Sequence, residues 1–231
     1  MSKQIALVAE GKTDLIVIEA VLKAIIGNDF VLKLLQPIPT INEQLGGGWS
    51  GVFRWCRQYL DKGRLSYSNY DFLILQLDSD VATKEYSDGL NSSEYEQRND
   101  LPCAKPCPPV SDTINELQNV VMGWLDLPCI QHMPQNWILC LPAPSSEAWL
   151  VIGYYPHNPD NIFANIECNL RLQDWLAQRP ISEGKRFVTA DHKKRTIRYI
   201  EVAGKITESW PLIRQLCTQA QKFHHDIEQL L

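Results

Sequence analysis

An apolar run from Phe72 to Leu77, interrupted only by Gln76 and followed by Asp78, constrains the fold of this 231-residue chain more than any other segment. A strand this uniformly apolar must be covered on both faces. Three further segments have a similar character, at residues 4–9, 29–38 and 136–142, and the stretches between them show helical spacing of apolar residues. The pattern predicts an α/β fold in which a mainly parallel sheet is flanked by helices.

The rest of the chain is expected to complete one domain covering residues 1–231. We find no internal repeat, no low-complexity tract and no clear linker. The α/β core is expected to span about residues 4–152. Residues 83–110 are polar and end in a proline-rich stretch, which predicts an irregular insertion. From about residue 160 to residue 231 the pattern predicts a helical C-terminal tail.

Charge and hydropathy limit the classes of protein to which the chain can belong. The formal net charge of −5 argues against a protein that binds nucleic acid with its whole surface, although it leaves a local basic patch open. No apolar run approaches the roughly 20 residues that span a bilayer, and the N-terminus has no signal-peptide pattern. We therefore expect a cytoplasmic protein with no membrane partner.

The seven cysteines do not form a recognisable zinc motif. Three lie in apolar settings and are expected to be small buried hydrophobes: Cys56, Cys140 and Cys217. Cys103 and Cys107 form a single C-x3-C pair, with Cys129 and His132 as the only candidates to complete a site. Because a structural zinc site needs four ligands, usually in two close pairs, we do not expect one here.

Acidic residues follow three of the four predicted strands: Glu10, then Asp78 and Asp80, and Glu147 shortly after the last strand. Chemistry in doubly wound sheets gathers at this end of the strands. Extended residues two apart point to the same face, so Asp78 and Asp80 would repel each other unless a cation lay between them. Carboxylate oxygens suit Mg²⁺ or Mn²⁺, and together these acids predict a metal site.

Each acid also has a purely structural interpretation. Aspartate is common at the start of a turn, which would account for Asp78 and Asp80. Glu147 lies in the first turn of a predicted helix, where the helix dipole favours an acid. Glu10, next to Gly11, would then simply begin a loop.

Two sequence motifs that contain these acids resemble a known domain. "LVAEGKTD" before a helix, with "LILQLDSD" two elements later, resembles the TOPRIM domain of topoisomerases, primases, ribosomal-RNA-maturing ribonucleases and OLD-family nucleases. "GGGW" and "PSSEAWL" add a similarity to the stand-alone DUF4276/RloB-like prokaryotic proteins. The resemblance covers about residues 4–152 and implies a Rossmann-like sheet. Glu10 then matches the TOPRIM Glu, Asp78 and Asp80 match its D-x-D, and Glu147 matches the acid of the E-x-W-L segment.

The resemblance implies a Mg²⁺- or Mn²⁺-dependent nuclease acting on DNA or RNA, in prokaryotic defence or nucleic-acid processing. Asp78, Asp80 and Glu147 would hold the metal, and Glu10 would be either a ligand or the general acid/base. A separate ATPase protein is an expected partner. Two alternatives stay open: a non-catalytic metal-binding or partner-binding module of a defence complex, and a small-molecule phosphohydrolase.

Two other stretches are candidates for binding phosphate groups. The glycines Gly46, Gly47 and Gly48 precede a helix, where they either cradle a phosphate or only allow a tight turn. A basic stretch is either a nucleic-acid-binding surface or a solvated loop, and it contains Lys193, Lys194, Arg195 and Arg198.

Overall fold

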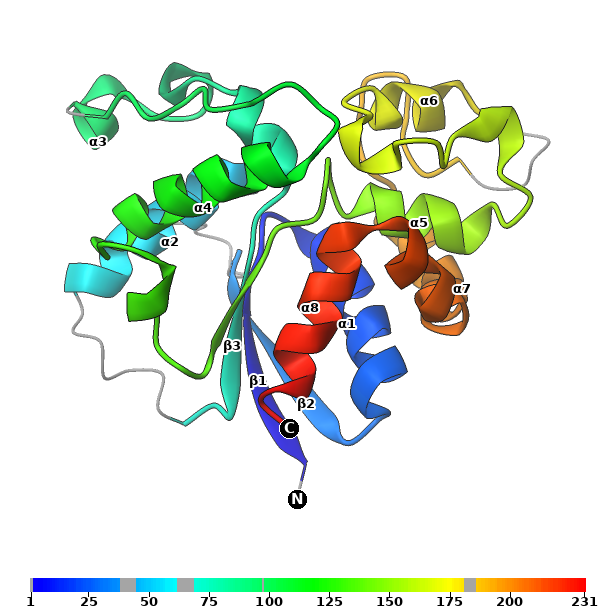
Figure 1. Ribbon diagram of the computed structural model, residues 1–231, viewed down its shortest axis with the longest axis horizontal. Helices are drawn as coiled ribbons and strands as arrows, with labels where there is room; N and C mark the ends of the chain where they lie inside the picture. The colour runs from blue at the N-terminus through cyan, green and yellow to red at the C-terminus, as the bar shows by residue number, and fades with distance from the viewer. Residues whose placement is uncertain (1, 38–44, 62–68, 97, 181–185) are drawn as a thin grey trace.

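The computed structural model describes residues 2–37, 45–61, 69–96, 98–180 and 186–231 (Figure 1). In this part of the chain, four parallel strands form one open sheet in the order β2-β1-β3-β4. The strands are β1 (Lys3–Val8), β2 (Phe30–Gln36), β3 (Phe72–Gln76) and β4 (Trp137–Cys140). The predicted α/β fold with a parallel sheet is confirmed, and all four carboxyl ends lie at one edge.

Alternation along the strands divides the core into two layers. Ile5 and Leu7 of β1 belong to one apolar cluster, and Ala6 and Val8 belong to the other. The first cluster is covered by α1 (Lys12–Ile26), α5 (Glu147–Tyr154), α7 (Thr196–Leu216) and α8 (Thr218–Glu228). The second is covered by α2 (Gly48–Asp61) and α4 (Ser111–Trp124), which lie on the opposite side of the sheet in Figure 1. None of the helices described here is long and apolar enough to cross a membrane.

The C-terminal part of the chain packs into the first of these layers. Trp149 of α5 is fully buried, and its ring lies 5.3 Å from that of Trp210 in α7 and 5.9 Å from that of Phe223 in α8. The expectation of a helical tail holds for α7 and α8. Between α6 (Leu172–Gln178) and α7, however, the backbone forms an antiparallel bridge between Val188 and Lys194.

Residues 83–110, apart from Gln97, contain only short helical turns. These are the end of a 3₁₀ turn (Ser79–Thr83), a second 3₁₀ turn (Tyr86–Asp88) and α3 (Ser92–Tyr95). The buried Tyr86 ties the segment to α4, because its hydroxyl accepts a hydrogen bond from Trp124 Nε1 at 2.8 Å and donates one to Asp100 at 2.8 Å.

Cys107 forms a disulfide with Cys168, and the Cα atoms are 5.6 Å apart. The C-x3-C spacing of Cys103 and Cys107 gave no indication of this bond. It ties the proline-rich stretch after α3 to the segment that precedes α6. The cysteines predicted to be buried thiols are free and buried: Cys56, Cys140 and Cys217.

Replacing Phe223 tests whether α8 is part of the main core. Phe223→Ala is expected to lower the free energy of unfolding by about 3–5 kcal/mol, because a ring 2% exposed and stacked on Trp149 leaves a cavity behind. Leu231→Ala is the control, because Leu231 is 56% exposed and its loss should cost less than about 0.5 kcal/mol. Urea unfolding of both variants measures the difference, and equal stabilities would show that α8 packs only loosely.

Candidate functional site

The candidate site lies where β1 and β3 end side by side, the point at which the strand order reverses. Val8 pairs with Leu75, so the strands β1 and β3 end next to each other. Glu10 and Asp78 each follow within two residues of these strand ends, and the Asp78 N–H donates a hydrogen bond to Glu10 Oε1 at 2.8 Å. Crevices at such a reversal are the usual ligand sites of open α/β sheets.

The buried amide of Gln76, the last residue of β3, fixes both acids. Gln76 Oε1 accepts a hydrogen bond from the Glu10 N–H at 3.2 Å, and its Nε2 donates to Asp78 Oδ1 at 2.9 Å. Asp80 lies two residues further on, in the 3₁₀ turn, where its N–H donates to the Pro144 carbonyl at 2.9 Å. The turn therefore holds Asp80 against the loop between β4 and α5.

The start of α5 brings in further polar groups. The Ser146 N–H donates to Asp78 Oδ1 at 3.1 Å, and the Ser146 hydroxyl donates to Asp14 Oδ1 at 2.6 Å. Asp14, in the first turn of α1, is 1% exposed. Asp14 was not among the site residues predicted from the sequence. The structure makes it one of the acids that converge there.

Glu147, the first residue of α5, is fully buried and is held by two donors from the C-terminal part of the chain. Lys194 Nζ lies 2.8 Å from Glu147 Oε1, and the Tyr199 hydroxyl donates to the same oxygen at 2.8 Å. Oε2 of Glu147 is buried and accepts no hydrogen bond in the described part of the chain. Tyr199 was not among the predicted site residues, and no signal in the sequence marks it.

Four acids line one cavity of about 290 Å³: Glu10, Asp14, Asp78 and Asp80. Lys84 and Lys194 line the same cavity, so the acids share it with two ammonium groups. Within the described ranges, no three His, Cys, Asp or Glu side chains are arranged to hold a metal ion. The acids therefore converge on a common space without forming a closed ligand cage.

Burial and mutual repulsion favour the protonated forms of these four acids. Burial, followed by the charges of Asp14 and Asp80, raises the pKa of Glu10 to about 8. The pKa values of Asp14, Asp78 and Asp80 are also raised, with burial as the largest cause for each.

Glu147 behaves differently from the other acids. Burial opposes its ionisation, but the charge of Lys194 and the hydrogen bonds from Lys194 and Tyr199 outweigh burial and lower its pKa. In turn, the charges of Glu147 and Asp14 outweigh the burial of Lys194, and its pKa lies well above the ordinary value. Glu147 and Lys194 therefore stay charged at neutral pH.

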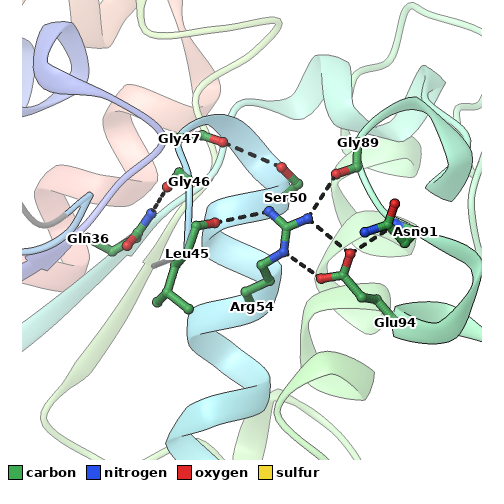
Figure 2. Close-up of polar contacts among 9 residues, drawn as sticks. All are labelled: Gln36, Leu45, Gly46, Gly47, Ser50, Arg54, Gly89, Asn91 and Glu94. Atoms are coloured by element: carbon green, nitrogen blue, oxygen red, sulfur yellow. Dashed lines mark hydrogen bonds and ion pairs between the residues drawn. The ribbon is translucent and has the colours of Figure 1, made fainter. Parts of the chain in front are cut away.

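The glycine turn, residues 46–48, borders this cavity at Gly48, and the carbonyls of Gly46 and Gly47 accept hydrogen bonds within the protein (Figure 2). Gln36 Nε2 donates to the Gly46 carbonyl at 2.5 Å, Ser50 Oγ donates to the Gly47 carbonyl at 3.4 Å, and the Gly48 N–H donates to the Glu10 carbonyl at 2.8 Å. Gly46 and Gly48 have φ values of 72° and 68°, which favour glycine. This geometry favours the interpretation as a tight turn over that as a phosphate cradle.

Arg54 of α2 braces the glycine turn from outside. Its guanidinium donates to the Leu45 carbonyl at 3.0 Å and to the Gly89 carbonyl at 3.2 Å, and it forms an ion pair with Glu94 of α3 (Figure 2). These bonds join the glycine turn and α2 to the segment that follows Asp80.

The four basic residues predicted to contact nucleic acid do not lie together on one surface. Lys194 points into the acidic site, whereas the side chain of Lys193 is 81% exposed and pairs with Asp191. Arg198 pairs with Glu201 on α7, and Arg195 is exposed. Lys194 therefore belongs with the acids rather than with a basic patch.

Comparison of the chain with protein-family models, curated proteins and solved structures found no match. The geometry of the site and the motifs of the sequence therefore carry the functional argument.

The raised pKa of Glu10 predicts how stability changes with pH. Between its ordinary value of 4.5 and about 8, the folded protein binds more protons at Glu10 than the unfolded chain does. This contribution to stability is fully present below about 4.5 and is lost as the pH rises through about 8. In EDTA, the melting temperature should therefore fall as the pH is raised across this window.

Glu10→Gln should flatten this fall, because glutamine does not titrate. Glu19→Gln, which removes an exposed acid on α1, should leave the fall unchanged. Thermal melts across a pH series measure both variants, and an unaltered slope in Glu10→Gln would contradict the raised pKa.

Proposed function

We propose that this protein is a Mg²⁺- or Mn²⁺-dependent phosphodiesterase of the TOPRIM type that cleaves DNA or RNA. The observation that carries the proposal is the convergence of Glu10, Asp14, Asp78 and Asp80 on one cavity at the reversal of strand order. Lys194 adds a permanent positive charge at the same place. The choice of nucleic acid as substrate, and a separate ATPase protein as partner, rests on the resemblance of the sequence motifs to TOPRIM proteins.

The donor set suits a divalent cation that prefers oxygen ligands. The four acids with raised pKa values cannot all ionise together at low cost unless positive charge is added between them. Asp78 uses Oδ1 for its hydrogen bonds with Gln76 and Ser146, and Glu10 uses Oε1 for its bond with the Asp78 N–H. Their second oxygens, together with Asp80, are the groups that would hold the cation.

When bound, such a cation would neutralise charge on the phosphate and lower the pKa of a coordinated water. The chain's own groups would complete the chemistry. Lys194, held against Glu147 at 2.8 Å, places a charged ammonium at the cavity wall, where it would stabilise negative charge developing on the phosphate oxygens.

Without a cation, the pKa of Glu10 is raised to about 8, and a cation bound beside it would lower this pKa toward the range that suits a general base. Because its Oε1 is fixed by the Asp78 N–H, Oε2 would be the oxygen that holds and releases a proton. Glu10 therefore has two possible roles in the proposed reaction, as a ligand and as an acid/base, and both require Oε2.

Asp78→Asn tests the proposal most directly. The change preserves the shape of the side chain but removes its charge, so metal-dependent cleavage of labelled single- and double-stranded DNA and RNA should fall by about 100-fold or more. Asp80→Asn and Glu10→Gln should show comparable losses. Lys194→Ala should reduce turnover, while Lys33→Ala, which removes an exposed charge on β2, should not.

The same assay has two outcomes that would overturn the proposal. Equal cleavage by wild type and Asp78→Asn would identify a contaminating nuclease. Absence of cleavage by wild type in Mg²⁺ and in Mn²⁺, with a candidate ATPase added, would favour a non-catalytic binding module.

A further inference from the structure

A second cavity of about 170 Å³ adjoins the acidic one. Asp80, Lys84 and Gln173 line both cavities, so these residues form the boundary between them. The walls of the second cavity come from the 3₁₀ turn after β3, from the loop before α5 and from the segment around α6. A ligand held at the acids therefore has space to continue in this direction.

Lys84 is the cation at this boundary, and its charge acts on Asp80 on the same wall. Its side chain is half-buried and makes no ion pair with the residues that the structure describes. Lys194, by contrast, lines only the acidic cavity, where Glu147 holds it at 2.8 Å. His192, on the far wall, is paired with Asp174 at 3.2 Å. Lys84 is therefore positioned to meet a phosphate that leaves the acidic cavity.

Apolar side chains lie on either side of the two cavities. Leu170, on the wall of the smaller cavity, is 62% exposed, so its side chain is accessible to a ligand in that cavity. Trp49, on the wall of the acidic cavity, is half-buried and stacks on Trp124 with ring centroids 6.4 Å apart. A ligand that crosses both cavities would meet an aromatic ring at one end and a leucine at the other.

From one cavity to the other, the lining passes from an apolar side chain to the acids, then to a cation and to a second apolar side chain. A strand of nucleic acid with accessible bases offers apolar and charged groups in a similar order. Base faces are free to pack on side chains in single strands, whereas in a duplex they are stacked on one another. We propose, building on the function proposed above, that the substrate is single-stranded. Its scissile phosphate lies over Asp78 and Asp80, Lys84 binds the adjacent phosphate, and Leu170 packs against the nucleoside beyond it.

Binding measured without turnover tests this subsite separately from catalysis. The probe is a short fluorescent oligonucleotide, as single-stranded DNA, single-stranded RNA and a duplex, titrated by anisotropy in Ca²⁺. Lys84→Ala should weaken binding of single strands by on the order of 10-fold and reduce the slope of log affinity against log salt by about 0.7, the value for one lost phosphate contact. Leu170→Ala should weaken binding several-fold and leave that slope unchanged, because it removes no charge.

Two matched controls remove the same groups elsewhere. Lys33→Ala removes an exposed lysine on the edge strand β2, and Leu231→Ala removes an exposed leucine at the C-terminus. Both should bind as wild type does. Affinities of Lys84→Ala and Leu170→Ala equal to those of the controls would overturn the inference, as would duplex binding equal to single-strand binding or no binding of any probe.

Cleavage assays on the same proteins separate this inference from the proposed function. If wild type cleaves and Asp78→Asn does not, but Lys84→Ala binds normally, the nuclease proposal stands and the subsite is wrong. If Lys84→Ala and Leu170→Ala lose affinity but wild type cleaves nothing, the nuclease proposal is wrong and the two cavities are a binding cleft for single strands.

Discussion

The parallel pairing of β1 with β3 is the constraint on which the site depends. Because both strands end at the same edge, the residues that follow them must share the space above the sheet, and Glu10 and Asp78 come within one hydrogen bond of each other. Helix α1 starts at that edge as it leaves β1, which brings in Asp14, and α5 starts there as it leaves β4. A pairing of β1 with β3 in any other register would separate these groups.

Strand ends are a local property of the sequence, which is why much of this arrangement was predictable. Apolar runs and the acids that terminate them placed Glu10, Asp78 and Asp80 at one edge once the sheet was taken to be parallel. The position of Asp14 also followed in principle, since a helix that crosses back over a parallel sheet begins at its carboxyl edge. An acid in the first turn of a helix is already favoured by the helix dipole, so its presence there does not by itself indicate a site.

Other parts of the site depend on contacts that no local pattern encodes. Lys194 reaches Glu147 because a short antiparallel bridge turns the chain just before α7, and Tyr199 follows one turn into that helix. In the sequence, Lys194 is one of several neighbouring cations and nothing distinguishes it. The bond between Cys107 and Cys168 is equally non-local, because the pairing of cysteines cannot be deduced from their spacing.

The cluster of buried acids lowers the stability of the fold. Buried like charges are costly, and neutral hydrogen-bonding groups such as Gln76 and Ser146 offset only part of that cost. Two further features reduce the cost of burying these like charges. Glu147 is paired with the half-buried Lys194 and stays ionised, while Glu10 and Asp78 have raised pKa values.

Environments that separate the pKa values of neighbouring acids often assign them different chemical roles. Here the separation follows from the position of Lys194, which pairs directly with Glu147 and lies further from the remaining acids. Glu147 is then a fixed anion that orients Lys194, and it contributes a charge that does not change with pH near neutrality. The acids at the ends of β1 and β3 can respond to what enters the cavity, because protonation and cation binding both relieve their repulsion. A single lysine, placed to one side of the cluster, thus separates five buried or half-buried acids into one that stays ionised and four whose pKa values are raised.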